Sequence, residues 1–284
     1  MNERDAGPII GMMSYVYGNS SAEEMAAAIN GHGIAFAQVD PRQKGLLDGD
    51  GRMGIRQAEH IRKVFQQQGI SIPVLSGYMN LLDPDPGRRE ANLQEMEEMI
   101  ELCPSFGAGC IATETGSLHP TNPWGHHPDN DTEAAWDALL HVTERLRLRA
   151  ASNGVTLLLE GYVNNVLSTA ERAARLIREL PSAGLGLVMD PFNYIKEADL
   201  KRQEEALDVI FDAIAPHCVI AHAKDTLYTA KGIHTPRAGT GLMQWELVAD
   251  RLTRTMPDAV LYLEHLQPDE VEECLAFIRQ AYRQ

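Results

Sequence analysis

Four short apolar runs decide the fold: VTLLLE at residues 155–160, LGLVMD at 185–190, CVIAH at 218–222 and AVLYLE at 259–264. Each run is typical of a buried β-strand, and each ends on a residue type that binds metals. The four terminal residues are Glu160, Asp190, His222 and Glu264. Divalent cations such as Mn²⁺, Co²⁺, Mg²⁺ or Zn²⁺ prefer this set of ligands. If the strands are parallel neighbours in one sheet, the four side chains meet at one rim, and the sequence predicts a metal site and therefore an enzyme.

These runs belong to a longer series, because strand-like and helix-like stretches alternate along the whole chain. Further strands are predicted at residues 9–14, 34–40, 72–77 and 109–114. Apolar residues at helical spacing follow the strands. The predicted helices cover residues 21–30, 55–68, 90–102, 132–152, 168–180, 200–215, 244–256 and 268–282. The first helix opens with Ser21 and carries Glu24 three residues later, which is the arrangement of a capping box.

Eight β–α units without a break in composition favour a single (β/α)8 TIM barrel, with residues 1–284 as one domain. A doubly wound open sheet is the competing architecture. It would usually show a glycine-rich phosphate loop after the first strand, whereas residues 15–20 read YVYGNS. In a barrel, catalytic groups lie at the C-terminal ends of the strands. The four metal-binding residue types would end strands five to eight, where they would repel one another or stay unpaired without a cation.

Bulk properties limit the partners that we expect. The formal net charge is −15, whereas binding to nucleic acid needs clustered Lys and Arg, so we expect neither a nucleic acid nor a membrane as a partner. The four cysteines are scattered without a CxxC pair, which is typical of reduced thiols in a cytoplasmic protein. No signal peptide is visible at the start, and no apolar run approaches the roughly 20 residues that span a bilayer.

Five segments follow one another in a characteristic order: LLLEGY at 157–162, VMDPFN at 188–193, IAHAKDT at 220–226, RAGTGLMQW at 237–245 and LYLEH at 261–265. They resemble the xylose isomerase-like TIM-barrel superfamily, a group of sugar isomerases and epimerases, inosose dehydratases, hydroxypyruvate isomerases and family-2 AP endonucleases. The order of an H-x-K-D segment, a G-T-G segment with an aromatic residue, and a strand that ends in Glu-His is fairly specific for the superfamily. It says little about the substrate.

The resemblance implies that Glu160, Asp190, His222 and Glu264 bind one divalent ion, with Mn²⁺ expected first and Mg²⁺, Co²⁺ or Zn²⁺ as alternatives. It also implies that Glu160 and Glu264 are the catalytic acid/base pair. This pairing is chemically reasonable, because a cation that polarises a carbonyl makes the neighbouring proton removable. One carboxylate then takes the proton and the other returns it. We therefore expect an isomerase or epimerase of a small sugar or keto-sugar that transfers a proton through a metal-bound enediolate.

One position departs from the pattern of the ketose epimerases. Many of them carry a histidine three residues after the aspartate of strand six, and this chain has Asn193 there. An amide can donate a hydrogen bond but cannot shuttle a proton near neutral pH. This leaves a dehydratase or lyase of a keto-sugar or inosose as an alternative. A DNA-repair AP endonuclease is less expected, because it needs a trinuclear zinc cluster with more histidines and a basic face.

Four residues are candidates for substrate binding. Glu114 ends strand four, Asn193 follows strand six, Lys224 follows His222, and Arg237 lies in the glycine-rich loop after strand seven. Each has an ordinary alternative: Lys224 could pair with Asp225 at the rim, and Arg237 could be a solvated loop residue. The expected partner is a small-molecule sugar, and a homo-oligomer is possible.

Other residues near the predicted strand ends are weaker candidates. His265 should point away from the mouth by strand alternation, unless the strand has already ended. Any of the tyrosines just beyond the strand ends could form a wall of the pocket; they are Tyr15, Tyr17, Tyr78 and Tyr162. The long loop at residues 116–131 contains Trp124, His126 and His127 and is a candidate lid. Adjacent histidines in such a loop are usually solvated, so a second metal there is not favoured.

Overall fold

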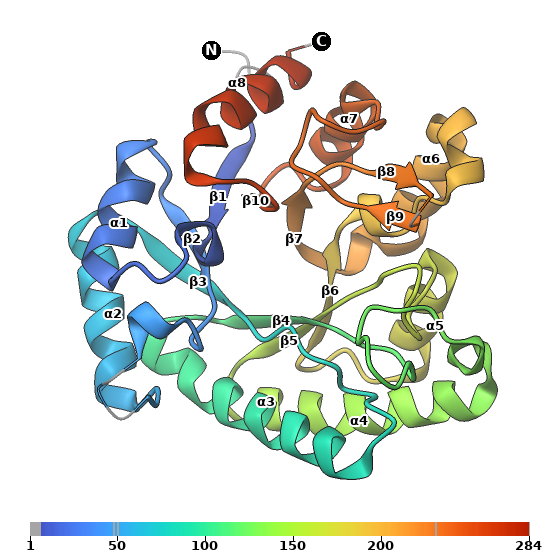
Figure 1. The fold of residues 1–284 in the computed structure, drawn as a ribbon, viewed down its shortest axis with the longest axis horizontal. Helices are drawn as coiled ribbons and strands as arrows, with labels where there is room; N and C mark the ends of the chain where they lie inside the picture. Colours follow the sequence, from blue (N-terminus) through green and yellow to red (C-terminus); the bar gives the residue numbers. More distant parts are fainter. Residues whose placement is uncertain (1–6, 48, 50, 231, 284) are drawn as a thin grey trace.

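In the described part of the chain, a closed barrel of eight parallel strands is surrounded by eight α-helices (Figure 1), which confirms the predicted (β/α)8 fold. The computed structural model describes residues 7–47, 49, 51–230 and 232–283. Residues 1–6, on which part of the signal-peptide expectation rests, lie outside the described residues. The barrel strands are β1 (Ile9–Met13), β2 (Phe36–Val39), β3 (Ser71–Ser76), β4 (Cys110–Glu114), β5 (Thr156–Glu160), β6 (Leu185–Met189), β7 (Cys218–Ala223) and β10 (Val260–Leu263).

The strand order explains why the four C-terminal runs meet. Strands β4, β5, β6, β7 and β10 are consecutive neighbours, and β10 pairs with β1 to close the barrel. The register is parallel throughout, so all strands end at the same mouth. It places Glu114 of β4 directly opposite Glu160 of β5, and Tyr262 of β10 opposite His222 of β7.

Helices cover the outside of the barrel, and several of them begin at a residue whose side chain caps the first turn. Ser21 and Glu24 form the predicted capping box at the first helix. The third helix is longer than its predicted range of 90–102, because Asp85 caps its start and Pro86 occupies its first turn. The helices are α1 (Ala22–Gly31), α2 (Ile55–Gln67), α3 (Pro86–Phe106), α4 (Glu133–Ser152), α5 (Ala170–Glu179), α6 (Gln203–Ile214), α7 (Trp245–Thr255) and α8 (Val271–Ala281).

A small hairpin on the rim is the main element that the sequence analysis missed. After β7 the chain forms the antiparallel strands β8 (Leu227–Thr229) and β9 (Gly232–His234). Tyr228 anchors the hairpin by donating a hydrogen bond from its hydroxyl to the carbonyl of Ile195, at 2.7 Å. Each strand has only three residues, too few to give a periodic pattern.

Two long loops at the mouth are tied together by one buried side chain. The amide of Asn80 donates to the carbonyl of Ser117 at 2.8 Å and accepts from the backbone N–H groups of Ser117 and Leu82 at 3.1 Å. Gly116 makes this possible, because its φ is 82° and a Cβ there would overlap the amide of Asn80. The loops after β3 and β4 therefore form one unit. No helix among the described residues combines the length and apolarity of a membrane span.

Candidate metal centre

Four side chains from adjacent strands converge at the mouth of the barrel. Glu160 is the last residue of β5, Asp190 directly follows β6, His222 lies in β7, and Glu264 directly follows β10. One ligand atom from each residue lies within 4.8 Å of the others. The four residues are between 0% and 5% exposed. The sequence prediction that these strand ends meet is therefore matched by the geometry.

The cluster fits a divalent cation in both its donor atoms and its unmet bonding capacity. Three of its buried atoms lack a hydrogen bond, namely Asp190 Oδ2, His222 Nδ1 and Glu264 Oε1. These atoms lie within ion-pair distance of other charged groups, but without hydrogen-bond geometry. Buried polar atoms are normally satisfied, so three of them this close together fit a site that a shared cation would complete. Carboxylate and imidazole donors suit Mn²⁺, Mg²⁺, Co²⁺ and Zn²⁺.

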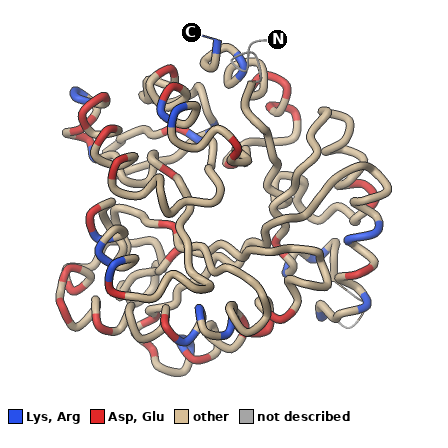
Figure 2. Tube along the Cα trace, turned by 180° about the vertical axis from the view of Figure 1, so that it is seen from behind, with Lys and Arg blue, Asp and Glu red and all other residues tan. Residues whose placement is uncertain are grey.

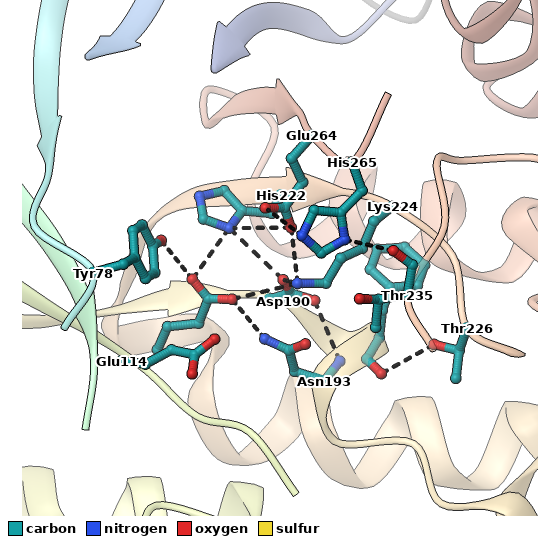
Figure 3. A network of polar contacts seen from close by, with 12 residues as sticks. Tyr78, Glu114, Asp190, Asn193, His222, Lys224, Thr226, Thr235, Glu264 and His265 are labelled. Atoms are coloured by element: carbon teal, nitrogen blue, oxygen red, sulfur yellow. Dashed lines mark hydrogen bonds and ion pairs between the residues drawn. The ribbon is translucent and has the colours of Figure 1, made fainter. Parts of the chain in front are cut away.

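Lys224 lies inside the cluster and supplies positive charge to it (Figure 3). Its Nζ is 2.5 Å from Asp190 Oδ2, 2.8 Å from Glu264 Oε1 and 3.6 Å from Glu160 Oε1. Burial alone would lower the pKa of Lys224, but the surrounding carboxylates raise it well above its usual value. The alternative of a rim pair with Asp225 is wrong, because the Asp225 carboxylate accepts hydrogen bonds from backbone N–H groups instead.

His222 is oriented by a residue that the sequence analysis did not single out. Its Nε2 lies 3.2 Å from Oε1 of Gln38, a buried side chain of β2. Its Nδ1 faces the carboxylates, at 3.2 Å from Glu160 and 3.7 Å from Asp190. Burial would lower the pKa of His222, but the charges of Glu160 and Glu264 raise it to about 10. The sequence contains a signal for this role, because Gln38 is a polar residue within the predicted barrel strand at residues 34–40.

The carboxylate of Glu160 is held at both oxygens. Tyr78 donates from its hydroxyl to Oε2 at 2.6 Å, and Asn193 donates from Nδ2 to Oε1 at 2.6 Å. Burial would raise the pKa of Glu160, but the positive charges of His222 and Lys224 lower it to about 2. Asn193 thus contacts the cluster directly, in the position where many ketose epimerases of the resembling superfamily carry a histidine.

A cavity of about 520 Å³ opens above the cluster. Glu114 lines it, next to the cluster but outside the network of contacts drawn in Figure 3. Asn165 donates to its carboxylate at 2.8 Å. Burial and the charge of Glu160 raise the pKa of Glu114 to about 8. Other wall residues include Tyr15, Tyr78, Trp124, Tyr162, Arg42 and Asp40.

Some predicted candidates lie elsewhere. Arg237 does not line this cavity, because its guanidinium pairs with Glu270 at 3.0 Å and with Glu273 at 2.9 Å. His265 does line it, since β10 ends at Leu263 and His265 then adopts a positive φ of 57°. Strand alternation therefore does not apply to His265, because the strand has already ended, which is the exception stated for this residue.

Some of the remaining aromatic and histidine candidates line the cavity and others do not. Tyr17 is absent from the lining of this cavity, unlike the three other tyrosines. His127 accepts a hydrogen bond from the N–H of Asp129 and caps a short turn. Within the described part of the chain, His126 and His127 belong to no metal-binding cluster. Of the candidate lid, Trp124 alone reaches the cavity.

Comparisons with known proteins agree with this architecture. The sequence model of a family described as xylose isomerase-like TIM barrel matches residues 23–281. No curated protein sequence matches the chain.

Solved structures share the fold at low sequence identity. A xylose isomerase-like TIM barrel protein from Mycobacterium smegmatis, in complex with magnesium, is 18% identical, with a TM-score of 0.69 over 99% of this chain and 100% of that one. The 3-keto-D-glucoside 4-epimerase YcjR from E. coli is 18% identical, with a TM-score of 0.70 over 96% and 99%. The probable 3-DHS dehydratase AsbF from Bacillus anthracis is 14% identical, with a TM-score of 0.70 over 96% and 97%. Likeness at this identity shows the shared fold.

Proposed function

The chain belongs to the xylose isomerase-like TIM-barrel family, and from this premise we propose that it is a divalent-metal-dependent isomerase or epimerase of a small sugar or keto-sugar. The observation that carries the proposal is the buried cluster of Glu160, Asp190, His222 and Glu264, whose two glutamates line an open cavity. A fold alone hosts many activities, so the argument depends on the site. Similar folds occur in a 3-keto-D-glucoside 4-epimerase and in a D-tagatose 3-epimerase-like protein.

When bound by these four residues, a divalent ion would polarise a substrate carbonyl and stabilise the negative charge that develops when the neighbouring carbon loses its proton. Mn²⁺ is the first ion to test, and Mg²⁺, Co²⁺ and Zn²⁺ are the alternatives. The proton itself is handled by side chains of the chain. Glu160 ends β5 and Glu264 directly follows β10, so one can accept a proton and the other can return it at the next carbon or on the opposite face.

The neighbours of these two glutamates orient them. The hydrogen bonds from Tyr78 and Asn193 fix the plane of the Glu160 carboxylate before a substrate arrives. Lys224 carries a buried ammonium group beside Glu264 and Asp190, and it can donate hydrogen bonds to substrate oxygens. Burial of the cluster strengthens each of these electrostatic interactions.

A dehydratase or lyase acting at the same site is the second candidate, and Glu114 is the observation that favours it. Glu114 adds a carboxyl group to the cavity beyond the pair that a proton transfer between neighbouring carbons requires, and unlike the Asp40 carboxylate it is not paired with Arg42. Loss of a hydroxyl group needs an acid to protonate the oxygen that leaves. A structure with this fold is described as a probable 3-DHS dehydratase.

An AP endonuclease is supported less well. The described residues offer one cluster of four ligands, whereas a trinuclear zinc site would need more. Basic positions alternate with acidic ones along the outer helices in Figure 2 and do not gather on one face there. Phosphate backbones are bound through clustered Lys and Arg.

Exchange with heavy water tests the proposal. The Mn²⁺-loaded protein is incubated in D₂O with a panel of ketoses and keto-sugars, and deuterium at the carbon next to the carbonyl is followed by NMR. We expect exchange with at least one sugar, together with an isomer, an epimer or a dehydrated product that distinguishes the two candidates. Glu264→Gln should abolish the exchange, whereas Glu59→Gln, on the exposed face of α2, should retain it. Metal-loaded protein that exchanges no member of the panel would contradict the proposal.

A further inference from the structure

A second hollow, of about 600 Å³, lies beside the cavity of the metal centre. The two hollows share three lining residues, namely Tyr15, Thr235 and His265. We call the cavity over the cluster the inner hollow and the second one the outer hollow. Each has the size of an ordinary small-molecule site. A ligand confined to the inner hollow would leave the outer one unused.

The boundary between the hollows is a built feature. His265 donates from its backbone N–H to the Tyr15 hydroxyl at 2.8 Å, and its Nδ1 lies 2.5 Å from the carbonyl of Thr235. Among the described residues it is the one non-glycine residue with a positive φ. That conformation costs on the order of 1 kcal/mol, and such strain tends to occur at functional sites. The loops that follow β1, β9 and β10 are thereby joined into one ridge.

Charge in both hollows is balanced within the protein. In the inner hollow, Arg42 forms a bidentate ion pair with Asp40, at 2.9 and 2.8 Å. Lys224 forms an ion pair with Asp190 of the cluster. In the outer hollow, Arg237 is held by Glu270 and Glu273. Every Lys or Arg among the described lining residues therefore has a carboxylate partner. Outside the metal centre itself, a phosphate or carboxylate on the ligand would find no free cation among these lining residues, whereas hydroxyl groups would find both donors and acceptors.

Aromatic surface at the boundary suits a sugar ring. Tyr15 is 39% exposed, although its hydroxyl accepts a hydrogen bond from the N–H of His265. Trp124, which lines the inner hollow, is 42% exposed. Exposed aromatic side chains with a polar environment present a flat apolar face beside hydrogen-bonding groups. The C–H face of a sugar ring can pack on such a surface while its hydroxyls reach the polar walls.

We propose that the substrate is an uncharged disaccharide-like glycoside, whose keto-sugar ring occupies the inner hollow and whose second hydroxyl-rich ring occupies the outer hollow. The link between the rings crosses the ridge of Tyr15, Thr235 and His265. This inference rests on the proposed sugar chemistry of the metal centre, and it names the substrate class. It excludes sugar phosphates as the preferred ligands.

Binding of unreactive sugars tests this inference. Isothermal titration of the Mn²⁺-loaded protein is carried out with maltose, cellobiose and sucrose, with glucose and fructose, and with glucose 6-phosphate. We expect at least one disaccharide to bind tenfold or more tightly than its component monosaccharides, and glucose 6-phosphate to bind no better than glucose. His234→Trp places a bulky side chain in the outer hollow. It should bring the ratio of disaccharide affinity to monosaccharide affinity close to one. His217→Trp is the matched control, because His217 precedes β7 at the opposite end of the barrel.

The outcomes separate this inference from the proposed function. Equal affinities for disaccharides and monosaccharides would overturn the inference and leave the sugar chemistry intact. Tightest binding by glucose 6-phosphate, or an unchanged preference in His234→Trp, would also overturn it. Metal-loaded protein that binds none of the sugars would overturn both the inference and the proposed function.

Discussion

At the scale of single residues, Lys224 and a metal ion compete for the same carboxylates. In the protein without metal, the ammonium of Lys224 lies against Asp190 and Glu264 and offsets their charges. Removing one partner of a buried ion pair typically costs about 3–5 kcal/mol, because the other charge stays buried and unpaired. A bound cation supplies the missing charge and stabilises the folded state by mass action.

We therefore expect Lys224→Met to destabilise the metal-free protein by about 3 kcal/mol and to gain more stability from Mn²⁺ than the unchanged protein does. Thermal unfolding with EDTA and with Mn²⁺ measures both effects. Lys63→Met, on the exposed face of α2, serves as the control and should change neither value. Equal stabilisation by Mn²⁺ in Lys224→Met and in the unchanged protein would show that Lys224 does not compete with the ion for the carboxylates.

Gln38 acts one step further from the ion, by orienting His222 through the contact at Nε2. Residues that orient a metal ligand typically contribute 10–100-fold to metal affinity. Gln38→Leu should thus weaken Mn²⁺ binding by about 10-fold or more, as measured by titration calorimetry. Gln66→Leu, an exposed substitution of the same kind in α2, should leave the affinity unchanged. Unaltered affinity in Gln38→Leu would mean that the ring of His222 is fixed by packing alone.

At the scale of elements, the loops after β3 and β4 depend on Asn80. Asn80→Ala leaves the buried N–H groups of Leu82 and Ser117 and the carbonyl of Ser117 without this partner. Such unsatisfied groups cost about 1–3 kcal/mol each, so a loss of at least about 2 kcal/mol in the free energy of unfolding is expected. Urea unfolding measures it. Asn30→Ala, where the amide is exposed on α1, should cost less than half as much. A neutral Asn80→Ala would refute the coupling of the two loops.

The elements also show which features the sequence could reveal. Buried parallel strands are continuous apolar runs, so the eight barrel strands were predicted to within about two residues of their observed ends. The observed start of α3 lies before the predicted range of 90–102, because Asp85 caps the helix and Pro86 occupies its first turn. Gln38 and Tyr78 were not placed at the cluster, because their contacts with His222 and Glu160 join strands that are far apart in sequence. The ligands at the strand ends could be predicted from the sequence, because the parallel strands of a barrel all end at the same mouth.

At the scale of the whole molecule, the buried cluster links stability to pH. The pKa of His222 rises from 6.5 to about 10 in the metal-free fold. A raised pKa contributes stability in full below the ordinary value of 6.5, and this contribution is lost as the pH rises towards about 10. The pKa of Glu160 falls from 4.5 to about 2, so its contribution is present above 4.5 and is lost as the pH falls through that window.

Urea unfolding in EDTA should therefore show a free energy of unfolding that declines between pH 6.5 and 10. His222→Gln should flatten this decline, because the variant has no imidazole to lose its proton. Stability that is constant or rises across this window would contradict the charged state assigned to the metal-free cluster.

The most direct test of the account is the metal content of the protein. Protein purified without added metal, then supplied with Mn²⁺, is analysed by elemental mass spectrometry together with Glu160→Gln, Glu264→Gln and the exposed control Glu59→Gln. The account predicts about one divalent ion per chain in the unchanged protein and in the control, with binding weakened by about 10-fold or more in the two cluster variants. Three zinc ions per chain, or no ion even with Mn²⁺ in excess, would contradict it.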